Sequence, residues 1–165
     1  MANNVRKEFE LYEPMRVWLQ KYLEEKYKGW SVITIDSHAR TLDSFLEENN
    51  AISQYPQSVG LDIQIDVLGI LKKGVKTNIV FIEAKKTSLN LHDLGQLWAY
   101  CKLCEPFEAF LLSSKDLGSL NKILNNLNRT DLLEFGDGKF IKKIQVGKWD
   151  ITKNSVDYST LLPKL

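Results

Sequence analysis

Three residues near the middle of the chain are of the types that hydrolyse phosphodiester bonds with a metal ion. Asp66 lies in a segment that alternates apolar and polar residues, and Glu83 and Lys85 directly follow the apolar run 79–82. Residues two apart on a strand point to the same side, so the spacing predicts that the Glu83 carboxylate and the Lys85 ammonium share one face. Charged groups at the end of an apolar strand indicate a function, because an unpaired buried charge is costly.

The chemistry that uses this set is metal-assisted hydrolysis. Carboxylates on adjacent strands are ligands that Mg²⁺ prefers, and Mn²⁺ can replace it. We therefore predict metal ligation by Asp66 and Glu83, with the backbone carbonyl of Ala84 as a third protein ligand. A bound metal polarises a phosphoryl group and lowers the pKa of a bound water. The ammonium of Lys85 would stabilise the attacking hydroxide or the negative charge that develops.

Other interpretations of these residues stay open. Asp66 could be a polar residue at the end of a hairpin, and Glu83 and Lys85 could form a solvated ion pair, which is worth little. Asp62 shares the expected strand face of Asp66. It stands four residues away, and we expect it to lie outside the metal shell.

A β-hairpin is expected to position the set. Residues 61–71 alternate Leu, Ile, Ile and Val with polar residues, which predicts a half-buried strand with Asp66 on its polar face. The turn is expected at Lys72-Lys73-Gly74, and a second strand at 78–86. The short connection predicts an antiparallel pair.

The remaining pattern predicts an α/β fold, a single domain over 1–165 with a mixed central sheet flanked by helices. The expected elements are a helix over 7–28, a strand over 30–36, a polar insert over 37–58 with a short helix at 41–49, a helix capped by Ser88 or Asn90 and ending near 104, a strand over 107–112, a helix over 117–127 and an edge strand over 140–149.

Asp66 followed by Glu83-Ala84-Lys85 across a short hairpin resembles the PD-(D/E)xK nuclease superfamily. The resemblance covers roughly residues 8–112, and it implies a restriction-endonuclease-like core with the order αβββαβ, Mg²⁺ as the cofactor and DNA as the substrate. The sequence departs from the motif at Ile65, where the superfamily often has proline.

The resemblance also implies supporting residues on two helices. The superfamily often places a glutamate on the helix before the motif, here Glu13 with Glu10 as the second choice, although the helix dipole alone favours an acidic first turn. The RecB-like branch carries Q-x-x-x-Y on the next helix, matched here by Gln96 and Tyr100. By resemblance these two would orient the catalytic residues or contact the DNA backbone; for Tyr100, packing is the alternative.

Charge sets limits on the expected partner. The chain has 22 Lys plus Arg and 21 Asp plus Glu, a formal net charge of +1. Strong, purely electrostatic DNA binding is therefore not expected. Local lysine clusters could still contact phosphates, and we name Lys73 and Lys86 as candidates. Ser37 and His38, at the end of the first strand, are candidates for lining the cleft.

We therefore predict a Mg²⁺-dependent nuclease acting on DNA. The alternative is a catalytically inactive module with the same fold that binds nucleic acid or a protein. A homodimer is possible, and no small-molecule cofactor is expected. The absence of a long apolar run predicts a cytoplasmic protein without a membrane span. Cys101 and Cys104 are expected to pack in the interior rather than to bind a metal.

Overall fold

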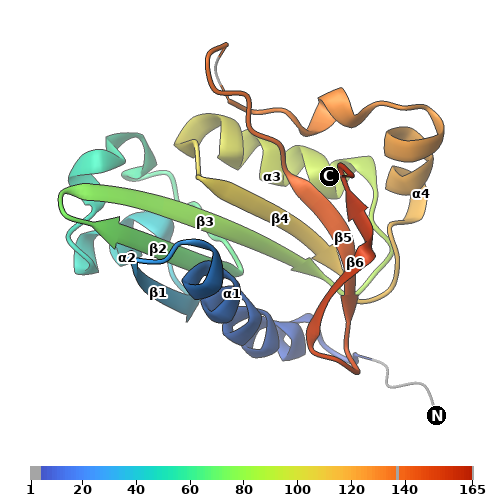
Figure 1. Cartoon of the computed structure of the whole chain (residues 1–165), viewed down its shortest axis with the longest axis horizontal. Coiled ribbons are helices and arrows are strands. Elements are labelled where there is room, and N and C mark those ends of the chain that lie inside the picture. Colours follow the sequence, from blue (N-terminus) through green and yellow to red (C-terminus); the bar gives the residue numbers. More distant parts are fainter. Residues whose placement is uncertain (1–4, 137, 165) are drawn as a thin grey trace.

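The computed structural model describes residues 5–136 and 138–164. Its central feature is a six-stranded sheet whose strands follow one another in chain order (Figure 1). The strands are β1 (Ser31–Asp36), β2 (Val67–Lys73), β3 (Lys76–Lys85), β4 (Glu108–Ser113), β5 (Gln145–Asp150) and β6 (Ser155–Leu162). The helical elements are η1 (Glu8–Leu11), α1 (Tyr12–Lys26), α2 (Leu42–Glu48), η2 (Ile52–Gln54), η3 (Pro56–Ser58), α3 (Leu91–Cys104), α4 (Gly118–Asn121), η4 (Lys122–Asn126) and η5 (Thr130–Leu133).

The sheet is mixed. β1, β2 and β3 are antiparallel neighbours, β4 runs parallel to β3, β5 runs parallel to β4, and β6 returns antiparallel. Parallel neighbours need a long crossover, which α3 supplies between β3 and β4. The carboxyl ends of β3, β4 and β5 therefore lie at one edge of the sheet. The predicted mixed α/β architecture is confirmed, and so is the antiparallel hairpin.

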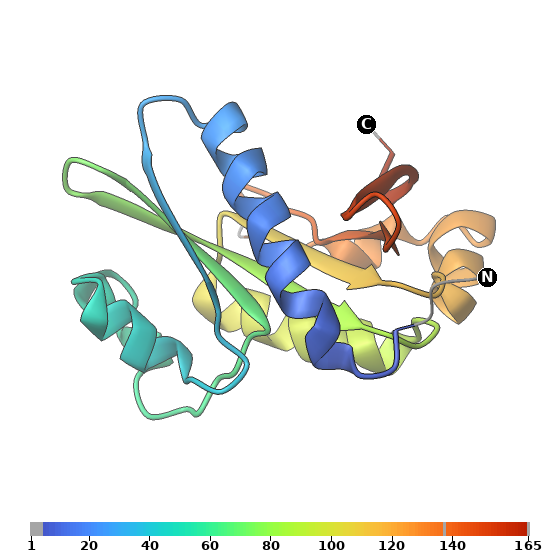
Figure 2. The ribbon, with the colours of Figure 1, turned by 90° about the horizontal axis from the view of Figure 1, so that it is seen from below.

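Helices cover both faces of the sheet. α1 packs on one face, and α2, α3 and α4 lie on the other (Figure 2). The α1 side is rich in aromatic contacts, with the Trp18 ring centroid 5.4 Å from that of Phe110 and 6.1 Å from that of Trp149. Cys101 and Cys104 are free thiols buried on the α3 side, as predicted. No helix in the described ranges is long and apolar enough to cross a membrane.

The prediction of a strand over 61–71 is wrong for its first half, residues 61–66. β2 begins only at Val67, and Asp66 therefore lies just before the strand rather than on its polar face. Ile63 and Ile65 are buried in an irregular segment, whereas Leu61 is 52% exposed. β2 itself is not half-buried, because its residues 67–71 are covered on both faces. The apolar and polar residues that alternate over 61–66 therefore belong to an irregular segment in which only Ile63 and Ile65 are buried apolar residues.

The C-terminal prediction is corrected as well. The strand expected over 140–149 begins at Gln145, and Phe140 and Ile141 are largely exposed. β5 is not an edge strand, because β4 and β6 pair with it on its two sides. The edge strand on this side of the sheet is β6, which the sequence pattern did not predict. The helix expected over 117–127 is present as α4 and the π-helical turn η4.

The connection that follows β3 is fixed by short-range contacts. Asn90 caps α3 and forms a capping box with Asp93, which confirms one of the two predicted caps. The N–H of Leu89 donates to the carbonyl of Asp116 at 3.2 Å. Gly118 adopts a φ of +51°, and a Cβ there would lie 2.4 Å from the Leu89 carbonyl oxygen. This glycine therefore allows α4 to approach the loop between β3 and α3.

We expect Gly118→Ala to lower the free energy of unfolding by about 2 kcal/mol, because the left-handed backbone and the close carbonyl both oppose a Cβ. Gly95→Ala is the matched control. Gly95 lies inside α3 with open space around a built Cβ, so alanine there should raise stability by about 0.5–1 kcal/mol. Urea denaturation measures both variants. Equal effects from the two substitutions would contradict the assigned contact.

Candidate active site

Asp66 and Glu83 hold each other through backbone hydrogen bonds. The N–H of Ala84 donates to Asp66 Oδ2 at 2.8 Å, and the N–H of Asp66 donates to Glu83 Oε1 at 3.3 Å. The Asp66 carboxylate thus accepts a hydrogen bond from the backbone next to Glu83, and the Glu83 carboxylate accepts one from the backbone of Asp66. The hairpin pairing ends one step earlier, at Val67 and Ile82. The two carboxyl groups predicted to act together are therefore brought together where β2 and β3 separate.

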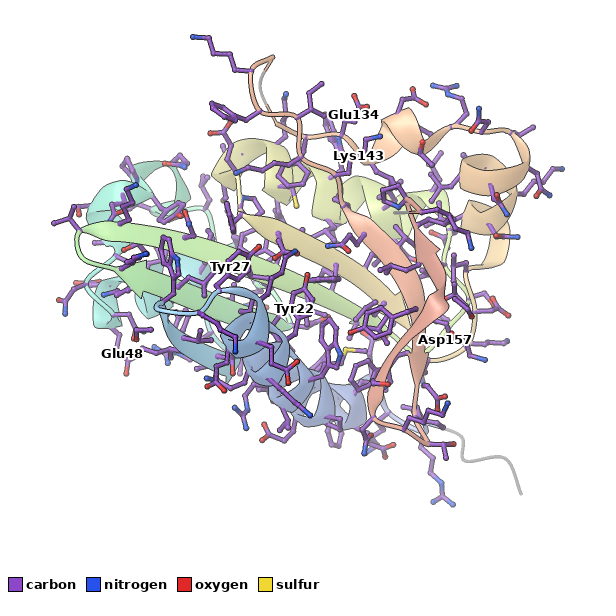
Figure 3. The ribbon with its side chains drawn as sticks, in the orientation of Figure 1. Tyr22, Tyr27, Glu48, Glu134, Lys143 and Asp157 are labelled. Carbon is purple, nitrogen blue, oxygen red and sulfur yellow. The ribbon has the colours of Figure 1, made fainter. Side chains whose placement is uncertain are left out.

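The environment of Glu83 differs from that of the other buried glutamate. Glu108, at the opposite end of the parallel strands, is 9% exposed and accepts hydrogen bonds from Tyr22, Tyr27, Lys26 and Gln145. Figure 3 labels Tyr22, which lies in the C-terminal half of α1, and Tyr27, which directly follows that helix. Glu83 is 7% exposed and, within the described ranges, accepts only the N–H of Asp66. A buried carboxylate with so few donors is poorly compensated.

The pKa values of both Asp66 and Glu83 are raised, as expected for buried carboxylates with few hydrogen-bond donors. Burial, and next the charge of Asp66, raise the pKa of Glu83 from 4.5 to about 8, although Lys85 acts to lower it. Burial also raises the pKa of Asp66, against the opposing effect of the Ala84 N–H. Two carboxylates this close cannot both ionise easily without a cation. The pair is therefore suited to hold either a shared proton or a bound cation.

Lys85 is half-buried and projects from β3 on the same side as Glu83, as the spacing predicted. Its charge acts to lower the pKa of both Asp66 and Glu83. Burial, then the neighbouring Cys104 and then the charge of Glu83 raise the pKa of the Cys101 thiol.

Two residues that the sequence analysis did not select also reach the site. The hydroxyl of Tyr12, at the start of α1, lies near Asp66 and acts to lower the pKa of that carboxyl. Burial, and then the charge of Asp66, raise the pKa of this tyrosine. Glu8, one turn earlier in η1, adds negative charge that raises the pKa of Asp66 and Glu83. The spacing of four between Glu8 and Tyr12 was the available signal, since such residues share a helix face.

The predicted helix residues are placed differently. Glu13 has a 63% exposed side chain and pairs with Arg16 at 2.7 Å, so the structure does not bring it to the carboxylates. Glu10 is also exposed, and it accepts the N–H of Arg6. Gln96 is exposed on α3. Tyr100 is half-buried and packs against the core cluster on the α3 side.

The two lysines chosen as phosphate contacts lie at opposite ends of the hairpin. Lys86 directly follows β3, where its N–H donates to Glu8 Oε2 at 3.4 Å and its ammonium to the Arg6 carbonyl at 2.9 Å. Lys73 is at the turn, six residues along β2 from Val67 and thus about 20 Å from the carboxylates. Lys86 is beside the site, and Lys73 is remote from it.

Ser37 and His38 are placed next to the site. The N–H of Ser37 donates to the backbone carbonyl of Asp66 at 3.0 Å, and its hydroxyl donates to the carbonyl of Ile65. The His38 ring lies 5.0 Å from the Tyr12 ring, centroid to centroid, and its Nδ1 is 2.5 Å from Asp36 Oδ1. Asp62, by contrast, is exposed with a φ of +51°.

The oxygen ligands available beside Asp66 and Glu83 are suited to a hard divalent cation. Asp66 and Glu83 supply carboxylate oxygens, and the N–H and C=O of one strand residue point to the same edge, so the Ala84 carbonyl faces the side of Asp66. All of these donors are oxygen, which suits Mg²⁺ or Mn²⁺. Among residues 5–136 and 138–164, no three or more His, Cys, Asp or Glu side chains form a metal-holding group. A cation would therefore keep open positions for water and substrate.

We expect Glu83→Gln to stabilise the protein in EDTA, and increasingly so as the pH rises. A raised pKa means that the folded state keeps its proton longer than the unfolded chain, so wild-type stability falls between pH 4.5 and about 8. Each unit of difference in pKa is worth about 1.4 kcal/mol. Glutamine removes this loss and can still accept the Asp66 N–H.

Thermal unfolding at several pH values tests this expectation. Glu13→Gln is the control with the opposite sign, because Arg16 lowers the pKa of Glu13. Parallel curves for wild type and Glu83→Gln across the whole range would show that Glu83 titrates as an ordinary exposed residue.

Comparisons with known proteins leave the family of this chain open. No protein-family model, no curated protein and no solved structure matches it. Any assignment of function therefore depends on the residues of the chain and on their geometry.

Proposed function

We propose that this protein is a divalent-metal-dependent nuclease that hydrolyses phosphodiester bonds of DNA. The observation that supports the proposal best is the pair Asp66 and Glu83, two carboxylates held together by reciprocal backbone hydrogen bonds in a poorly compensated environment. Burial of such a pair costs stability. Glu108 demonstrates that the same fold can satisfy a buried carboxylate fully, so the deficit at Glu83 is a local property of the site.

The proposed roles follow from position. Asp66, Glu83 and the carbonyl of Ala84 would hold Mg²⁺ or Mn²⁺, which when bound polarises the phosphoryl group and lowers the pKa of its water. The ammonium of Lys85, on the same side as Glu83, would stabilise the attacking oxygen or the charge that develops on phosphate. The hydroxyl of Tyr12, which lies near Asp66, would help to orient the Asp66 carboxylate.

We further propose that the fold is of the restriction-endonuclease-like type. In support, a helix is followed by three antiparallel strands, a crossover helix and a fourth strand parallel to the third. This is the αβββαβ order that the resemblance to PD-(D/E)xK nucleases implies. Gln96 and Tyr100 on the crossover helix would then contact the DNA backbone or support the site.

The acidic residue before the motif is best assigned to Glu8. Its carboxylate acts on the pKa of Asp66, Glu83 and Tyr12, whereas Glu13 is paired with Arg16. Glu8 would bind the cation through water or orient its water ligands. This assignment replaces Glu13 in the proposed machinery.

A second candidate function is binding of nucleic acid without turnover. It is supported by the position of Lys86, which directly follows β3 beside the site. A module of this kind would use the same edge of the sheet, with Lys86 and neighbouring donors, and would not require a cation.

We expect the purified protein to cleave DNA with Mg²⁺ or Mn²⁺ and to lose the activity in EDTA. Asp66→Asn and Lys85→Ala should each reduce the rate by at least about 100-fold, because they remove a metal ligand and a charge stabiliser. Gel assays on single-stranded, duplex and branched DNA provide the measurement. Cleavage that persists in both variants would refute the proposal, and binding without cleavage on every substrate would favour the second candidate.

Exchange of the two N-terminal glutamates tests the assignment of Glu8. Glu8→Gln should lower the cleavage rate about tenfold or more and raise the Mg²⁺ concentration for half-maximal activity, whereas Glu13→Gln should leave both near the wild-type values. Both substitutions remove one carboxylate from the same helical segment. Loss of activity in Glu13→Gln with a normal Glu8→Gln enzyme would reverse the assignment.

A further inference from the structure

The carboxyl ends of the three parallel strands carry lysines in register with the candidate site. Lys85 on β3 is the cross-strand partner of Ser113 on β4, and Ser113 is the partner of Lys148 on β5. Partners in register project to the same face of a sheet, so Lys148 lies on the side of Glu83 and Lys85. With neighbouring strands about 4.8 Å apart, the Cα atoms of Lys85 and Lys148 are roughly 10 Å apart.

A hollow adjoins this row of residues. It has a volume of about 690 Å³, and its lining includes Lys86, Ser114, Lys115, Lys148 and Thr152. A second hollow of about 530 Å³ shares Lys148 and adds Asn121, Asn125, Thr160 and Lys164. Lys148 lines both hollows. The carboxyl ends of β3, β4 and β5 lie together at one end of the sheet (Figure 1). Ligands of open α/β sheets bind outside the carboxyl ends of the strands.

The ammonium groups of Lys115 and Lys148 form no hydrogen bond or ion pair within the described ranges. Two aspartates also border the first hollow, but both are occupied by their own loops. Asp150 Oδ1 accepts the N–H groups of Thr152 and Lys153, and Asp157, labelled on β6 in Figure 3, accepts the N–H and hydroxyl of Ser159. Lys148 is also the cross-strand partner of Asp157, and its charge helps to lower the pKa of that carboxyl, after the hydrogen bonds from Ser159. Because neither ammonium is held by a hydrogen bond or an ion pair in the described ranges, both can turn towards a ligand.

We infer that Lys115 and Lys148 hold the phosphodiester backbone of a nucleic-acid strand on the β5 side of the site. The inference rests on the proposed function, because it takes the scissile phosphate to lie at Asp66, Glu83 and Lys85. A strand that leaves this point across the sheet edge meets Lys115 in the loop after β4 and then Lys148 on β5. The hydroxyl and amide groups around Lys148 supply further donors to phosphate oxygens.

Binding without turnover tests the inference. Fluorescence anisotropy in EDTA measures the affinity of the whole protein for labelled single-stranded DNA, with single-stranded RNA and duplex DNA as further arms. The test variant is Lys115→Gln/Lys148→Gln. The matched control is Lys73→Gln/Lys76→Gln, which removes the same charge from the remote hairpin turn. Thermal unfolding confirms that both variants are folded.

We expect the Lys115/Lys148 variant to bind single-stranded DNA roughly tenfold more weakly, and its salt slope to fall by about 1.4, since each lost phosphate contact removes about 0.7. The hairpin variant should keep the wild-type slope. Equal losses in both variants would overturn the inference but leave the proposed nuclease untouched. Failure of the wild-type protein to bind any of the three nucleic acids would instead count against the proposed function, and the inference would fall with it.

Discussion

The hydrogen bond from the Ala84 N–H to the Asp66 carboxylate is the interaction on which the rest of the site depends. In a continued hairpin, this N–H would pair with a backbone carbonyl of β2. Because Asp66 takes it, the ladder ends at Val67 and Ile82, and the chain before Val67 turns away from β3. The end of β3 is thereby left open on one side, with the Ala84 carbonyl facing the same gap. One side-chain-to-backbone bond thus ends a strand and creates the candidate site.

The separation of β2 and β3 leaves two buried carboxylates close together, and neighbouring residues offset part of the resulting electrostatic cost. Asp66 and Glu83 repel each other in a buried place, and Glu8 adds negative charge to the same region. Tyr12 and the two backbone N–H groups offset part of this cost, and Lys85 offsets another part. Glu108 lies at the other end of the sheet with four donors and needs no such arrangement. The difference between the two ends follows from how many donors the neighbouring elements supply.

Local patterns in the sequence predicted most elements, but not the points where contacts distant in sequence decide the outcome. The spacing of Glu83 and Lys85 was enough to predict one shared face. The alternation up to Asp66 could not distinguish a strand from an irregular segment, because Ile63 and Ile65 are buried in both cases. Glu13 was chosen because the resemblance implies a glutamate on the helix before the motif, whereas the residue whose charge acts on the site is Glu8, in η1 before α1. β6 was not predicted, and its buried residues Val156, Leu161 and Leu162 do not alternate regularly with exposed ones along the strand.

The net charge of +1 does not describe how the charges are distributed over the folded sheet. Composition counts Lys85, Lys148 and Asp157 as three separate charges, but pairing places them in one line across β3, β5 and β6. At the β6 end of this line, the Asp157 carboxylate accepts hydrogen bonds from Ser159. At the β3 end, the carboxylates of Asp66 and Glu83 lie where β2 and β3 separate. A near-neutral chain can therefore present separate regions for a cation and for phosphate. Such regions act over a short range, because salt screens exposed charges beyond about 10 Å.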